Sequence, residues 1–157
     1  MRRILWIIGA LVVVVLVAMQ MHRPNFDLTP VDAAATLDAQ LHPDAGISTT
    51  LHKACYNCHS AEARIPWYGH VWPTSQLIQN DVRMGRARLD FSNWANLSPE
   101  MSRIRLQSSC SMMQQSKMPL WYYRPMHLGA APKAEEVAAF CNWVQSLPSE
   151  HEQASLR

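Results

Sequence analysis

Two cysteines and a histidine lie close together in the segment Cys55-Tyr56-Asn57-Cys58-His59. This C-x-x-C-H spacing is the attachment signature of c-type haem. On one turn of helix the two sulfurs reach the two vinyl groups of a porphyrin, and the following histidine becomes the proximal iron ligand. A chain of 157 residues that carries this motif must fold around a large apolar cofactor. The motif therefore predicts one covalent haem c, attached through Cys55 and Cys58 and ligated by His59.

Three other interpretations of the cysteine pair fit the sequence less well. A thioredoxin-type redox pair expects a strand before it, and no strand pattern precedes Cys55. A structural zinc site needs a second close pair of ligands, whereas Cys110 and Cys141 are far apart in the chain. A simple disulfide between Cys55 and Cys58 would leave His59 unexplained.

An apolar run from residue 4 to residue 19 follows Arg2 and Arg3, and only Gly9 interrupts it. With Gln20 and Met21 it approaches the ~20 residues that a membrane-spanning helix needs. Because positive residues stay in the cytoplasm, we expect a single-pass anchor in a bacterial inner membrane with the haem domain in the periplasm. The alternative is a cleaved signal peptide. The stretch 16–21 lacks a small-x-small cleavage site, so we favour the anchor.

Composition limits the class of protein. Apolar residues make up 48% of the chain and charged residues 17%, which suits one globular domain with an added apolar segment. The net charge is +2, and Arg2 and Arg3 alone account for that excess. The rest of the chain is near neutral, so we expect no binding of nucleic acid.

The pattern of apolar residues predicts an all-α fold, because no alternating run reaches strand length. We expect a small cytochrome c-like domain whose long loops wrap the haem. The expected divisions are an anchor at 1–21, a linker and short helix at 22–47, the haem domain at 48–148 and a disordered tail at 149–157.

Helix ends are suggested by capping residues and prolines. A first helix is expected at 51–58 with its N-cap within 48–50, and a second from residue 74 or 75 with Leu77, Ile78 and Val82 inward. A third is expected from Pro99 to about residue 115. The last follows Pro132, with an apolar face of Val137, Phe140, Cys141 and Val144.

The second axial ligand has several candidates, which are Met112, Met113, Met118, Met126, His70 and His127. We favour Met118, because a methionine followed by proline on a loop before the last helix is the pattern of class I cytochromes c. Its neutral thioether stabilises ferrous iron and raises the reduction potential. Met126 and His127 remain alternatives, and His127 would give a bis-histidine haem of lower potential. An open sixth site is a further alternative.

Aromatic residues near the motif are candidates for haem contacts. Arg64, Trp67, Tyr68 and Trp72 can pack on the porphyrin edge and bind its propionates, or they can be core aromatics with a surface arginine. Trp121, Tyr122 and Tyr123 can cover the distal face or fill their loop. Cys110 and Cys141 can form a disulfide in an oxidising compartment, and a buried thiol at Cys141 is the alternative.

The sequence resembles the haem-binding domain family of membrane-anchored or exported bacterial monohaem cytochromes c. The resemblance covers most of the chain. It rests on residues 23–25, the motif with Ser60, Ile65-Pro66-Trp67-Tyr68-Gly69-His70, the run from Gly85 to Trp94, Met118-Pro119 and His127. Leu120 stands where the family usually has a second proline. The resemblance implies haem binding and electron transfer, and it implies no particular partner.

The function expected from these features is transfer of single electrons between redox protein partners that the sequence does not identify. The residues supply no catalytic acid, base or nucleophile constellation, so we expect a carrier and not an enzyme. One alternative is a haem sensor or peroxidase-like enzyme with an open sixth site. Another is a haem subunit of a larger respiratory complex, with the anchor helix as an assembly contact.

Overall fold

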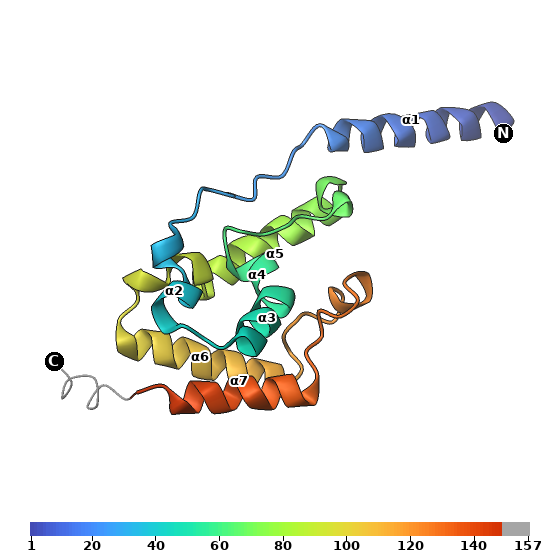
Figure 1. Ribbon diagram of the computed structural model, residues 1–157. Coiled ribbons are helices and arrows are strands. Elements are labelled where there is room, and N and C mark those ends of the chain that lie inside the picture. Colours follow the sequence, from blue (N-terminus) through green and yellow to red (C-terminus); the bar gives the residue numbers. More distant parts are fainter. Residues whose placement is uncertain (149–157) are drawn as a thin grey trace.

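The protein is helical throughout residues 1–148, the part of the chain that the computed structural model describes (Figure 1). This confirms the all-α prediction, while the tail expected at 149–157 lies outside the described residues. The α-helices are α1 (Arg2–Gln20), α2 (Leu37–Leu41), α3 (Ala45–Ala54), α4 (Tyr56–His59), α5 (Thr74–Arg88), α6 (Pro99–Gln114) and α7 (Ala134–Ser146). The 3₁₀ helices are η1 (Ala33–Ala35), η2 (Trp67–His70), η3 (Phe91–Asn96) and η4 (Arg124–Met126).

Helix α1 projects away from the rest of the molecule (Figure 1). It has 19 residues with a mean hydropathy of 2.3, and none of them is buried against the domain. At 1.5 Å per residue it is about 28 Å long, close to the ~30 Å hydrocarbon thickness of a bilayer. The apolar run therefore forms a single helix that is long enough and apolar enough to cross a membrane.

The core lies where α3, α6, α7 and η3 meet. Leu51, Phe91, Leu106 and Phe140 are fully buried there. Each such side chain contributes about 1.5–3 kcal/mol when it leaves water. Leu37 on α2 is also fully buried in this core. The division predicted at residue 48 therefore falls inside α3, and the domain core includes residues before it.

The first predicted helix, at 51–58, begins and ends at other residues in the structure, where it is α3 (Ala45–Ala54). Asp44 is the N-cap of α3, since its Oδ1 accepts from the backbone N–H of Ile47 at 2.9 Å. The N-cap expected within 48–50 was wrong, because those residues lie inside the helix. The helix also ends at Ala54, where Cys55 has a non-helical φ of −126°, so the cysteine motif continues on the separate short helix α4.

The later helices follow the predictions closely. Ser98 caps α6, with Oγ accepting from the N–H of Met101 at 3.1 Å. Phe140, Cys141 and Val144 are buried on α7 as expected, and Val82 is buried on α5. Leu77 is 46% exposed. Its predicted inward position was wrong, because at 3.6 residues per turn it lies on the opposite side of α5 from the buried Ser75.

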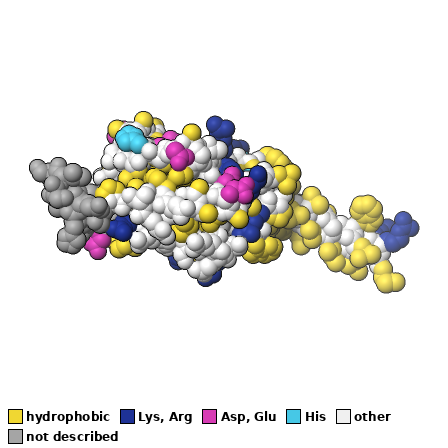
Figure 2. Space-filling model, turned by 60° about the horizontal axis from the view of Figure 1, so that its bottom comes forward, with side chains coloured by type: hydrophobic (Ala, Val, Ile, Leu, Met, Phe, Trp, Pro, Cys, Tyr) yellow, Lys and Arg dark blue, Asp and Glu magenta, His cyan; other side chains and the backbone are white. Residues whose placement is uncertain are grey.

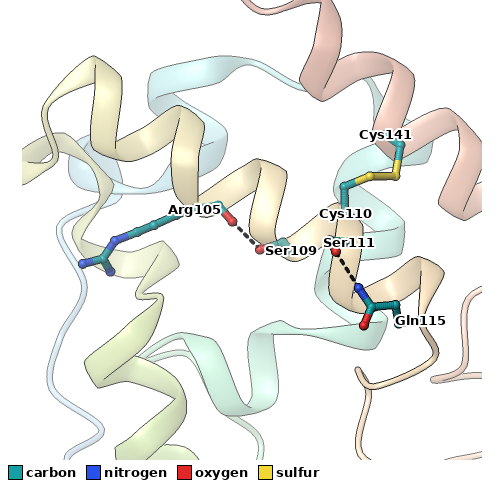
Figure 3. Close-up of a disulfide and its surroundings, with 6 residues drawn as sticks. All are labelled: Arg105, Ser109, Cys110, Ser111, Gln115 and Cys141. Carbon is teal, nitrogen blue, oxygen red and sulfur yellow. Dashed lines mark hydrogen bonds between the residues drawn. A yellow bond between two sulfur atoms is a disulfide. The ribbon is translucent and has the colours of Figure 1, made fainter.

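A disulfide links the last two helices. The sulfurs of Cys110 on α6 and Cys141 on α7 are 1.99 Å apart (Figure 3). Both residues belong to the core or pack against it. The bond therefore ties together the helix pair that forms one wall of the domain.

We predict that the double variant Cys110→Ala/Cys141→Ala loses about 3–4 kcal/mol of unfolding free energy. The reason is that the bond closes a loop between residues 31 positions apart and restricts the unfolded chain. Chemical denaturation of the purified protein measures the loss. Equal stability of the variant and the unmodified protein would show that this bond does not form in solution.

Candidate functional site

The two motif cysteines lie one helical turn apart. The carbonyl of Cys55 accepts from the backbone N–H groups of Cys58 at 3.1 Å and His59 at 3.0 Å. Both thiols are free. Burial raises the pKa of Cys55 to about 12 and that of Cys58 to about 11, with nearby Asp81 adding to the second shift. Redox-active C-x-x-C cysteines have lowered pKa values, which is the opposite direction from the shifts of this pair.

The His59 ring is held by the C-terminal end of α5. Its Nδ1 lies 3.1 Å from the carbonyl oxygen of Gly85 and 3.0 Å from that of Leu89. Carbonyl oxygens only accept, so Nδ1 carries the proton and Nε2 keeps its lone pair. Burial lowers the pKa of His59, which favours the neutral ring. A neutral imidazole with a free Nε2 is the form that binds a metal, and a carbonyl on Nδ1 is its usual support.

The close approach of α5 to α4 requires a glycine. A Cβ on Gly85 would lie 2.6 Å from the carbonyl oxygen of Cys58, which is a backbone atom and cannot turn aside. Neither Gly85 nor Leu89 was predicted from the sequence to have a role at the site. The available signal was a glycine inside a helical pattern, which often marks close packing.

A polar cluster fixes the other side of the motif. Asp38 on α2 accepts from Tyr56 Oη at 2.6 Å and Ser48 Oγ at 2.8 Å, and its Oδ2 lies 3.0 Å from His52 Nε2. The rings of His52 and Tyr56 are stacked with centroids 3.7 Å apart. Because Tyr56 is the residue after Cys55, this cluster holds α4 against α2 and α3.

The loop that follows Met118 is attached beside the motif. Asn57, inside the motif, donates from Nδ2 to the Tyr123 hydroxyl at 2.9 Å. Tyr122 donates to Asp81 on α5 at 2.9 Å. The two contacts bring the Met118 loop to α4 and α5, although it is far from them in the sequence.

The candidates for the second axial ligand occupy different surroundings. Met113 is 5% exposed and packs in the core with Leu106 and Phe140, so its role is packing. Met118 is half-buried. Met112 and Met126 are exposed.

Two histidines were also candidates. His127 stacks on Tyr123, with ring centroids 3.6 Å apart, and lies 3.1 Å from the Tyr68 hydroxyl through Nε2. His70 is exposed and meets the edge of Phe26. Met118 and His127 are both half-buried on the loop that Tyr123 ties to the motif, and His127 Nδ1 also lies 3.0 Å from the Tyr123 carbonyl oxygen.

The four predicted contact residues lie on the segment after the motif. The backbone N–H of Arg64 donates to Asn57 Oδ1 at 3.0 Å, and the side chain is exposed. Trp67 is 76% exposed, which excludes a core position. Tyr68 is half-buried beside His127. Trp72 is half-buried, and its backbone pairs with the Gln20 side chain.

The model of the haem-binding domain family matches residues 13–146. The chain belongs to the haem-binding domain family. No curated protein and no solved structure shows a significant match. The donor set of this haem-binding protein fits its cofactor, because the motif offers two free thiols and one imidazole nitrogen. Within residues 1–148, no group of three or more His, Cys, Asp or Glu side chains is placed to hold a bare metal ion.

We predict that Asp38→Asn lowers the unfolding free energy by about 1–3 kcal/mol at neutral pH, because hydrogen bonds to a charged acceptor are weakened. Burial alone would raise the pKa of Asp38, but the hydrogen bonds from Tyr56, Ser48 and His52 lower it below 3.8. A carboxylate with a depressed pKa stabilises the folded state above its unfolded pKa and loses this effect as the pH falls. Denaturation curves at several pH values should show the difference between protein and variant shrinking below about pH 4. A difference that does not change with pH would contradict this role.

We predict that Gly85→Ala costs about 1–3 kcal/mol of stability through overpacking and lowers the haem content of the purified protein. The added methyl group displaces the Cys58 carbonyl and, with it, the support of His59. Gly9→Ala is the control, because Gly9 also lies inside a helix and no atom lies within 4 Å of the Cβ that it would gain. Denaturation and the ratio of haem to protein absorbance measure the two effects. Equal results for both variants would refute the role assigned to Gly85.

Proposed function

We propose that the protein is a membrane-anchored c-type cytochrome that carries one covalent haem in the periplasm and transfers single electrons between redox partners. The observation that carries this proposal is the state of the motif. Two free thiols lie one helical turn apart, and the next residue is an imidazole held through Nδ1 by two carbonyls. This is the arrangement that haem attachment through thioethers and a proximal histidine requires.

Each residue of the motif has a defined task in this proposal. Cys55 and Cys58 would hold the haem through thioethers to its two vinyl groups. His59 offers Nε2 to the iron, while the carbonyls of Gly85 and Leu89 keep the ring from turning. The bound haem supplies the one-electron chemistry of its iron.

Met118 is the proposed sixth ligand. The hydrogen bonds of Tyr122 and Tyr123 hold its loop to α5 and to the motif, which supports Met118 as the ligand. A neutral sulfur ligand favours ferrous iron and a higher potential. If His59 and Met118 both bound the haem iron, no site would remain on it for a substrate, which is why we propose electron transfer and not catalysis.

Helix α1 supports the proposed location. Arg2 and Arg3 precede it, and the positive-inside rule keeps them in the cytoplasm. The haem domain then lies on the opposite side of the inner membrane, where c-type haem is attached. The redox partners proposed for it are proteins of that compartment or of the membrane itself.

An absorption spectrum of the purified protein, ferric and then reduced, with a pyridine haemochrome assay, tests the proposal. A sharp ferrous c-type band and low-spin ferric iron are expected. A high-spin ferric spectrum that shifts with cyanide or carbon monoxide would favour a sensor or peroxidase-like enzyme. Co-purification of a respiratory complex in mild detergent would favour the subunit alternative. Absence of haem, in cells that mature c-type cytochromes, would refute the proposal.

We predict that Met118→Ala removes the weak long-wavelength sulfur-to-iron band of the ferric protein while the haem stays covalently attached. The potential should fall by on the order of 0.1 V, since axial ligands tune haem potentials over about 0.8 V. Met126→Ala is the control, because Met126 lies on the same loop and is exposed. Spectra and redox titration measure both variants. A band that survives in Met118→Ala and disappears in Met126→Ala would reassign the ligand.

A further inference from the structure

The segment between α1 and the domain is attached along its length. Gln79 on α5 donates from Nε2 to the carbonyl of Asn25 at 2.8 Å, and Arg86 donates to the carbonyls of Phe26 and Asp27. Phe26 is 6% exposed. The stretch expected to be a linker is therefore docked on α5, and the domain cannot swing freely about it.

A second contact ties the end of α1 directly to the domain. The side chain of Gln20, the last residue of α1, accepts from the N–H of Trp72 at 3.0 Å and donates to its carbonyl at 3.3 Å. Only residues 21–24 separate Gln20 from the docked Asn25. At about 3.5 Å per residue, this stretch cannot carry the domain far from the point where α1 ends.

Two loops lie at the end of the domain that is next to the C-terminus of α1. In Figure 1 these are the green loop that contains η2 and the orange loop that contains η4. They touch one another, because Tyr68 Oη lies 3.1 Å from His127 Nε2. Figure 2 shows hydrophobic side chains gathered at the end of the domain from which the N-terminal helix projects.

The apolar side chains of these loops are the immediate neighbours of the contact residues. Trp67 precedes Tyr68, Val71 precedes Trp72, and Met126 and Leu128 flank His127. Their exposed fractions are 76% for Trp67, 42% for Val71, 59% for Met126 and 95% for Leu128. Apolar side chains this exposed, gathered at one end of a small domain, indicate an interaction surface. We call these four residues the apolar edge.

The charged residues of the two loop segments are basic, and the Asp81 carboxylate on α5 lies beside them through its hydrogen bond from Tyr122. Residues 63–80 and 116–130 contain no aspartate or glutamate, and they carry Arg64, Lys117 and Arg124. Basic residues around exposed Trp, Leu and Met match the two layers of a bilayer surface, with anionic headgroups outside and hydrocarbon beneath. Tryptophan in particular prefers this interface.

We propose that the apolar edge rests in the interfacial layer of the phospholipid bilayer that α1 enters. The inference rests on the proposed anchoring by α1 and goes beyond it, because an anchored domain can also stand clear of the lipid. The docked segment and the Gln20–Trp72 pair hold the two loops at membrane level. The Met118 loop then faces the membrane, so the partner class that this orientation favours is a protein embedded in the same bilayer.

Photo-crosslinking of the full-length haem-loaded protein tests this orientation. The photoreactive residue p-benzoylphenylalanine replaces one residue at a time, and the protein is placed in nanodiscs of phosphatidylcholine with a minor fraction of phosphatidylglycerol. Trp67 and Leu128 probe the apolar edge. Val12 in α1 is the positive control, and Ile104 on α6, which is 48% exposed, is the matched surface control. Mass spectrometry of the irradiated protein measures the lipid adducts.

We expect lipid adducts at Trp67, Leu128 and Val12, and none above background at Ile104. Adducts at Val12 alone would overturn the inference and leave the anchoring intact. Equal adducts at Ile104 and Leu128 would also overturn it, because lipid contact would not be specific to the edge. Absence of adducts at all four positions would refute the anchoring by α1 and the inference with it.

Discussion

The hydrogen bonds from His59 Nδ1 to the carbonyls of Gly85 and Leu89 determine much of the surrounding structure. They require the end of α5 to lie against α4, and that approach leaves no room for a side chain on Gly85. The C-terminal end of a helix carries partial negative charge on its free carbonyls. The C-terminal end of α5 is therefore a favourable place for an imidazole whose Nδ1–H donates a hydrogen bond. That bond leaves Nε2 with its lone pair available.

The remaining contacts of the site hold α4 from its other sides. Asp38 holds Tyr56 from α2, and Asn57 holds Tyr123 from the Met118 loop. Both variable positions of the C-x-x-C-H motif thus make structural hydrogen bonds, while its cysteines and histidine keep their reactive atoms free. The same residues that connect the motif to the domain also bring the candidate distal ligand into its neighbourhood.

The docked segment at residues 25–27 and the Gln20–Trp72 pair link this site to α1. The polar, proline-bearing composition of that stretch is typical of a free linker, and composition alone does not reveal the partners of its carbonyls. Gln79 and Arg86 supply those partners from α5, more than fifty residues away in the sequence. The relation between α1 and the haem-binding domain is therefore a property of the fold.

The sequence by itself determined the haem family, the helical class, the apolar N-terminal helix and the positions of α5, α6 and α7. These depend on local signals, namely the spacing of Cys55, Cys58 and His59, capping residues such as Ser98, and apolar periodicity. Only the tertiary structure decided the start of the core before residue 48, the exposure of Leu77 and Trp67, and the packing role of Met113. It also decided that Gly85 and Leu89 support His59. These features depend on contacts between segments far apart in the chain, and such contacts are set by how helices pack, which no short stretch of sequence encodes.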